Sequence, residues 1–304
     1  MMRKSFAFLL ASGIFAFVSF TFVRMKEVPP SIPSNVALSS AGKSSLTGSR
    51  RLFSSSFSSQ SSVALTMNAV RLSNLLAYWR FDEGTGDRVK DSSGRGYHGL
   101  LRGFAGKVWS NEAAPVSFGS PYAMDFDGID DWIDLGSDLS IVRNVSAVTL
   151  SAWVRPDSIG DSGKTVVNFS VNNAGVPTAD SRALMVLNEV DEVRVGGRSA
   201  DDDELQSEIT TGGPIVPGQW HHVAGVIDYA GDDVRIYVNG VQQATAGTPN
   251  FSQSRTANTD STSNAIGSED DGSAFFFDGF IDDVRVFPRA LSASEIESLA
   301  LGKE

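Results

Sequence analysis

Alternating carboxylates on a strand can cleave glycosidic bonds, and one segment of the chain comes near this pattern. A Glu-x-Asp-x-Glu arrangement puts three carboxyl groups on one strand face, where a general acid and a nucleophile must lie. Here the pattern begins with Glu189 and Asp191, but its third position is Val193. The sequence therefore disfavours hydrolysis at this segment and predicts an acidic turn between two strands. Carboxylate pairs that converge from distant loops stay open as an alternative.

The histidines and serines show no pattern typical of a metal site or a nucleophile. His221 and His222 are adjacent, so on a strand they point to opposite faces and cannot chelate one metal as a pair. Cysteine is absent from the sequence, which excludes thiol chemistry, cysteine-ligated zinc and disulfides. No Gly-x-Ser-x-Gly elbow occurs, and no glycine-rich stretch matches a phosphate loop. We expect the segment from Trp220 to Val223 to pack structurally in a strand.

Aspartates are dense in two segments that could supply oxygen ligands to a metal ion. Four lie between Asp125 and Asp131, and two more form the pair Asp282-Asp283. Carboxylate oxygens are the ligands that calcium prefers. The first segment is not an EF-hand, because its Asp spacing differs and its twelfth position would be Gly136.

The net charge of −11 is divided unevenly along the chain. Residues 1–74 carry eight Lys and Arg against one Glu, a net +7, so residues 75–304 carry −18. A surface this acidic repels phosphate backbones, which argues against nucleic acid as a partner. Divalent cations and neutral or cationic ligands match it better.

The hydrophobic pattern after residue 75 has a period of two, with turn signals between the runs. Asn239-Gly240 is the strongest hairpin signal, and Ser292 to Glu295 fits a capping box that begins a short final helix. Regular short strands without long helices predict an all-β, antiparallel, two-sheet jelly-roll sandwich. We expect strands at 75–81, 97–101, 122–127, 132–135, 148–154, 165–171, 183–187, 192–196, 220–227 and 234–238, and a long one after residue 275.

Four segments occur in an order that points to one family. They are AYWRFDEG from Ala77, MDFDGIDDW from Met124, WHHVA from Trp220 and FFFDGFIDDVRVFPRALS from Phe275. Together they resemble the LamG-like jelly-roll family (laminin G-like) of the concanavalin A-like lectin/glucanase superfamily. The resemblance covers about residues 75 to 300 and implies a concanavalin A-like sandwich. Because this fold carries lectins, adhesive modules and glycanases alike, it does not by itself give a function.

Relatives of this fold commonly hold a structural calcium ion that ties the first strands to the last one. By this resemblance the predicted metal ligands are Asp282, Asp127 and Asp91, helped by backbone carbonyls near Phe81 or Asp82. Such a Ca2+ ion would mainly stabilise the fold. The alternative is that these aspartates start turns and solvate a sheet face.

The function expected from these patterns is a non-catalytic, exported binding module. Its expected ligand is a glycan or a surface glycoprotein, with calcium as a helper. The alternatives are a structural or adhesive protein-binding module and a glycan-cleaving enzyme, of which the enzyme is disfavoured. Tyr229 and Trp109 are aromatics that could stack on a sugar ring at a rim, unless they pack inside. The sequence does not predict an oligomeric state.

The amino-terminal segments are expected to deliver the domain out of the cytoplasm. Residues 1–26 contain an uncharged run between basic flanks, typical of a signal peptide or membrane anchor. Residues 27–74 are rich in Ser and Pro, and we expect a disordered linker before the domain at 75–304. We therefore expect a secreted or membrane-anchored protein that contacts a membrane only through its hydrophobic segment. Bipartite organelle targeting is a minor alternative.

Overall fold

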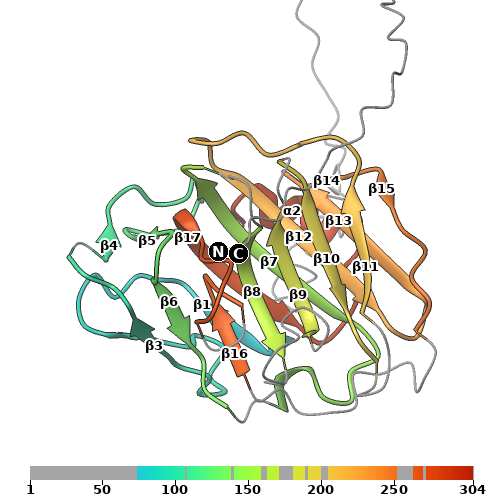
Figure 1. Cartoon of the computed structure of the whole chain (residues 1–304), viewed down its shortest axis with the longest axis horizontal. Coiled ribbons are helices and arrows are strands. Elements are labelled where there is room, and N and C mark those ends of the chain that lie inside the picture. The colour runs from blue at the N-terminus through green and yellow to red at the C-terminus, as the bar shows by residue number, and fades with distance from the viewer. Residues whose placement is uncertain are drawn as a thin grey trace, which may run out of the picture. The chain divides into compact units, whose positions relative to one another are not determined.

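Two antiparallel β-sheets make up the folded part of the protein, and Figure 1 shows them as stacked layers. The structure is a computed structural model that describes residues 74–106, 108–137, 140–158, 163–170, 181–188, 191–199, 205–251, 263–269 and 272–303. The sequence predictions for residues 1–26 and for nearly all of 27–74 lie outside these ranges. No helix in the described ranges is long and apolar enough to cross a membrane.

The first sheet, called sheet A, brings the first and last strands of the domain together. Its order is β14-β13-β12-β7-β17-β5-β4, and β1 pairs with β17 beside this path. Tyr78 lies opposite Arg285 in that last pair. The strands are β1 (Ala77–Trp79), β4 (Trp109–Ser110), β5 (Ala123–Asp127), β7 (Val148–Pro156), β12 (His221–Asp228), β13 (Asp233–Val238), β14 (Val241–Gln242) and β17 (Asp278–Phe287).

The second sheet, called sheet B, has the order β15-β11-β10-β9-β8-β16-β6-β3-β2. Neighbours such as β8 and β16 are far apart in sequence, as the long connections of a jelly roll require. A 3-10 turn, η2 (Ser140–Val142), precedes β7. The strands are β2 (Arg88–Val89), β3 (Gly99–Arg102), β6 (Trp132–Asp134), β8 (Lys164–Ser170), β9 (Ser181–Leu187), β10 (Val193–Gly197), β11 (Gln206–Thr210), β15 (Thr245–Ala246) and β16 (Ser263–Ile266).

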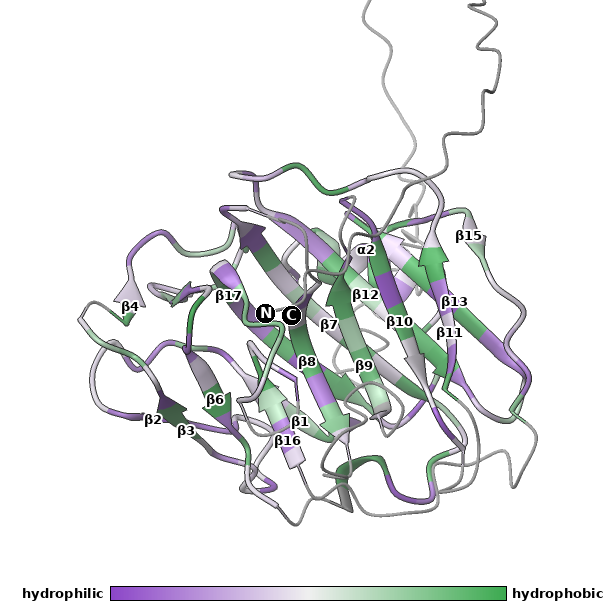
Figure 2. Ribbon diagram, in the orientation of Figure 1, coloured by the Kyte–Doolittle hydropathy of each residue, from purple (hydrophilic) through white to green (hydrophobic). Residues whose placement is uncertain are grey.

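The main core lies between the two sheets and is built from alternate residues of most strands, with exceptions at the register shifts of β8 and β17. Leu150 and Val154 of β7 contribute from sheet A, while Val167, Phe169 and Met185 contribute from sheet B. Because side chains alternate across a strand, the residues between them must point to the outer faces. Figure 2 shows the resulting mixture of hydrophobic and hydrophilic residues along the strands.

The helix α2 (Ala293–Ala300) covers part of the outer face of sheet A. Ser292 and Glu295 form the predicted capping box, which satisfies two amide groups at the start of the helix. Its buried residues Ile296 and Leu299 join a second apolar cluster with Tyr237 of β13. The outer face of sheet A is therefore partly a second core, whereas no helix in the described ranges covers sheet B.

The jelly-roll prediction is confirmed. Each strand expected from the period-two pattern is present, with its ends shifted by a few residues. Asn239 and Gly240 have φ of 51° and 81°, the left-handed pair that a tight hairpin turn needs. Five strands of two to four residues were not predicted, namely β4, β14, β15, β16 and β2, and neither was the five-residue β11.

Candidate functional site: carboxylate centres and the outer face of sheet B

Asp91 uses its carboxylate to hold a turn. Its oxygens accept hydrogen bonds from the backbone amides of Tyr78, Ser93 and Tyr97, at 3.1, 2.8 and 3.0 Å, and from the Ser93 hydroxyl at 2.8 Å. Burial alone would raise the pKa of Asp91, but these bonds outweigh it and lower the pKa. Both oxygens are thus engaged by the protein itself.

Asp282 is buried and incompletely bonded. Its Oδ2 accepts a hydrogen bond from the Ala114 amide at 3.0 Å, while its Oδ1 has no partner within the described residues. The Ser120 hydroxyl lies 3.3 Å from Oδ2 and 3.3 Å from a carboxylate oxygen of Asp82. Burial, together with the charges of Asp283 and Asp82, raises the pKa of Asp282 to about 8. A buried carboxylate oxygen without a partner, with oxygen groups around it, fits a calcium ligand.

A β-bulge places Asp283 beside a second polar group. The register of β17 on β7 shifts between Asp282 and Arg285, and Asp283 has a φ of 54°. The Tyr78 hydroxyl donates to Asp283 at 2.6 Å, and the buried Arg285 donates to the same oxygen at 3.0 Å. Burial pushes the pKa of Asp283 upward, while Arg285 and the Tyr78 hydroxyl oppose that rise. The ion pair lies within β17, and the hydrogen bond from Tyr78 joins β1 to it.

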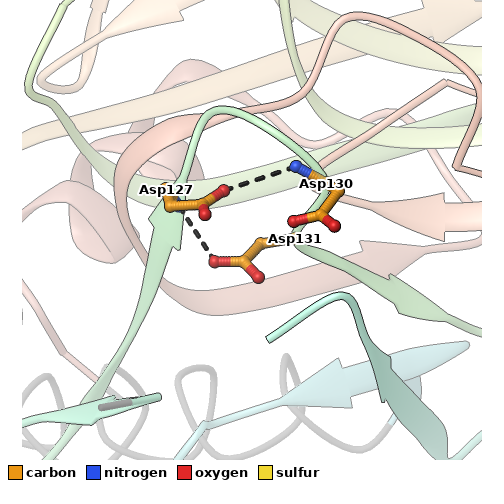
Figure 3. Close-up of side chains that lie close together, drawn as sticks. All are labelled: Asp127, Asp130 and Asp131. Carbon is orange, nitrogen blue, oxygen red and sulfur yellow. Dashed lines mark hydrogen bonds between the residues drawn. The ribbon is translucent and has the colours of Figure 1, made fainter. Parts of the chain in front are cut away.

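The turn between β5 and β6 holds a cluster of three carboxylates, from Asp127, Asp130 and Asp131. One ligand oxygen from each lies within 4.8 Å of the others, and Figure 3 shows them around the turn. Asp127 accepts from the Ile129 amide at 2.8 Å, and Asp131 accepts from the Asp127 amide at 3.0 Å. Burial and the charges of Asp127 and Asp130 raise the pKa of Asp131 to about 6.

Two of the predicted metal ligands, Asp127 and Asp282, lie in different places. Asp127 sits opposite Asp278, and Asp282 lies four residues further along β17, about 13 Å at the usual strand rise. Ligands of one calcium ion lie within about 2.6 Å of it, so Asp127 and Asp282 cannot share an ion. The sequence placed Asp131 in a segment that could supply metal ligands, but its position after an exposed turn gave no sign that it would be buried.

The two adjacent histidines take the structural positions that the sequence predicted. His222 lies 3.0 Å from the Ser151 hydroxyl and packs edge-on against Trp153. Burial lowers its pKa to about 3, so it is neutral. His221 accepts a hydrogen bond from the Val216 amide at 3.0 Å. Neither histidine is part of the three-aspartate cluster in the β5–β6 turn.

Two other sequence predictions concern aromatic and acidic residues. Tyr229 packs inside, which is the alternative to sugar stacking that the sequence left open, and its side chain is fully buried against Phe251. Trp109 lies partly buried against the core. Asp191 lies in the connection between β9 and β10, as the acidic turn predicts, whereas Glu189 lies outside the described residues.

The outer face of sheet B carries three polar groups without partners. Val167 and Phe169 of β8 point into the core, so Asn168 between them points outward. Neither amide atom of Asn168 has a hydrogen-bond partner within the described residues, and the same holds for the hydroxyls of Thr165 and Ser263. All three side chains are buried. A buried polar group usually has a partner, so these three require one.

The neighbours of Asn168 across the sheet are small or apolar. Leu184 of β9 and Ala265 of β16 lie directly opposite it, and Gly196 lies opposite Leu184 on β10. Such residues could contact the C–H surface of a sugar ring, while the amide and the hydroxyls would meet its hydroxyl groups. These groups have the donors and acceptors that a polar, uncharged ligand needs, although all three are buried here.

The sheet order and the core together define an antiparallel jelly-roll β-sandwich. The chain belongs to the concanavalin A-like lectin/glucanases superfamily, whose family model matches residues 127–297, more than half of its length. The resemblance drawn from the sequence motifs is thus confirmed. No curated protein matches the chain.

Solved structures with this fold include binding domains and an enzyme. The receptor binding domain of botulinum neurotoxin C/D mosaic serotype has a TM-score of 0.54 and 13% identity, over 76% of this chain and 52% of that one. Trypanosoma rangeli sialidase in complex with the inhibitor DANA has a TM-score of 0.52 and 16% identity, over 75% and 32%. This chain thus spans about half or less of each. At these identities the likeness shows the fold alone.

Proposed function

We propose that this protein is a non-catalytic glycan-binding module whose ligand lies on the outer face of sheet B. The observation that carries the proposal is the set of three partnerless polar groups on that face, Thr165, Asn168 and Ser263. A buried amide without a hydrogen bond costs about 1–3 kcal/mol. A sugar hydroxyl can both donate and accept, so it matches an Asn amide and two hydroxyls. The groups are buried, so binding requires this face to open to the ligand.

The acidic residues of sheet B support a binding role over hydrolysis. The strands of sheet B contain only two acidic residues, Asp134 and Glu208. Asp134 forms a salt bridge with Arg102. Glu208 lies opposite Val195, a core residue, and so points away from the outer face. Glycosidases need two carboxyl groups about 5 to 9.5 Å apart, and the strands of this face do not supply such a pair.

Exposed apolar residues give little support to an adhesive protein-binding surface. The large hydrophobic side chains exposed in the described ranges are scattered over separate elements: Leu100, Ile129, Val216, Val241 and Leu301. Single exposed apolar residues are ordinary on soluble proteins. The binding partner that we propose is accordingly a glycan, free or carried on a glycoprotein.

The experiment that tests this function is a binding screen of the full-length chain against a broad panel of glycans and polysaccharides. We expect at least one class of neutral glycan to bind, and Asn168→Ala to weaken it. Running the screen with calcium and again with excess chelator separates recognition from metal binding. Failure of every glycan to bind would contradict the proposal.

We further propose that Asp282 binds a structural calcium ion with help from Asp82. Asp282→Asn keeps an acceptor for the Ala114 amide, so we expect its stability without calcium to stay within about 1 kcal/mol of the wild type. Calcium at 100 times its Kd adds about 2.7 kcal/mol to the wild type. Thermal melting should therefore show a rise in Tm with calcium that is about 5–10 °C larger in the wild type than in Asp282→Asn. An equal rise in both proteins would contradict this role.

A further inference from the structure

We propose that the turn between β5 and β6 binds a second Ca2+ ion, through the carboxylates of Asp127, Asp130 and Asp131. The three side chains come from five residues of sequence and meet at the end of β5, as Figure 3 shows. Two of them, Asp127 and Asp130, are exposed. Exposed acidic groups are common, so these two alone would not define a site.

Asp131 supplies the observation that points to a ligand. It is only 5% exposed, and its Oδ1 is buried without a hydrogen-bond partner in the described ranges. The other oxygen is held by the Asp127 amide at 3.0 Å, which fixes the carboxylate in place. The fixed carboxylate thus keeps one buried oxygen that no donor of the described residues satisfies. A buried carboxylate in that position is stabilised by a cation.

The chemistry of the group favours calcium among divalent cations. All donors are oxygens, which excludes the soft metals that need Cys or His. Three carboxylates on a turn, open to water on one side, suit the flexible coordination of calcium better than the strict octahedron of magnesium. The turn is held against the sheet, because a Cβ at Gly103 would lie 1.9 Å from the Asp130 carbonyl oxygen. The carboxylates therefore project from a fixed backbone.

This site is separate from the one proposed at Asp282. The distance of about 13 Å along β17 between Asp282 and Asp278, the residue opposite Asp127, prevents a shared ion. Each site can therefore be removed without touching the other, and failure at one leaves the other proposal intact.

Terbium luminescence in the full-length chain tests the proposal. Tb3+ replaces Ca2+ at oxygen sites and emits when a nearby indole transfers energy, and Trp132 directly follows Asp131. We expect wild type and Asp282→Asn to give terbium emission that calcium displaces. Asp131→Asn keeps the acceptor for the Asp127 amide but lowers the ligand charge, so its calcium affinity should fall about 10-fold or more.

Two further variants make the result decisive. Ile129→Ser changes an exposed residue of the same turn, 72% exposed, without touching a carboxylate, and should bind as the wild type does. Asp130→Asn changes an exposed ligand and should weaken calcium binding. It keeps the test valid if Asp131→Asn, which changes a buried residue, alters the stability of the fold. Calcium affinity equal to the wild type in both Asp130→Asn and Asp131→Asn would overturn the proposal.

Discussion

Asp283→Asn should destabilise the protein by about 3–5 kcal/mol. Asp283 is the charge partner of Arg285, whose side chain is 1% exposed and donates to Asp283 at 3.0 Å. Removing one charge of a buried pair leaves the other charge unpaired in the low-dielectric interior of the protein. This unpaired charge is the main cost in folding free energy. Asn tolerates the left-handed φ of 54° at this position, so backbone strain does not enter. Urea unfolding followed by circular dichroism measures the difference.

A double variant separates the charge from the shape of the site. Asp283→Asn with Arg285→Met removes both charges and leaves an apolar chain of similar length, so it should be more stable than Asp283→Asn alone. If Asp283→Asn alone stays within about 1 kcal/mol of the wild type, the charge of Asp283 does not stabilise the buried Arg285 as we expect.

Trp79→Ala should cost about 3–5 kcal/mol through the cavity that it leaves. Trp79 is fully buried in the main core, and its indole donates to the Tyr97 carbonyl at 2.7 Å. The loss therefore includes an unpaired carbonyl as well as apolar contacts. Because β1 lies beside β17 at the junction of the first and last strands, this loss falls where the two ends of the domain meet.

Trp79→Phe is the matched control for this cavity. It keeps most of the apolar volume and loses the indole hydrogen bond, so it should cost about 1–3 kcal/mol. Urea unfolding of both variants against the wild type gives the two values. Equal stability of Trp79→Ala and the wild type would show that β1 does not contribute to the core.

The fold could be predicted from the sequence because its signals are local. Period-two patterns identify strands such as β7, and Asn239-Gly240 encodes a turn through two left-handed residues. Strands of two residues, such as β4 and β14, are too short to show a period. They form because neighbouring strands offer them unpaired backbone groups.

The site was less predictable because it depends on distant contacts. Simple alternation would place Asp282 and Asp283 on opposite faces, whereas the register shift after Asp282 breaks that rule. Alternation does show that Asn168, between Val167 and Phe169, faces away from the core. Its lack of a partner depends on what neighbouring strands bring to the sheet. For Asp91, which stays a prediction as a metal ligand, the sequence did not show that the amides of Tyr78 and Tyr97 would bond its oxygens.

The measurement that tests the glycan-binding proposal most directly is the affinity of Asn168→Ala for the tightest glycan in the screen. A lost hydrogen bond to a buried amide should raise Kd about 10-fold or more. Asn250→Ala, an exposed asparagine outside the strands, is the control and should leave Kd unchanged. An Asn168→Ala protein that folds normally and binds as tightly as the wild type would contradict the outer face of sheet B as the binding site.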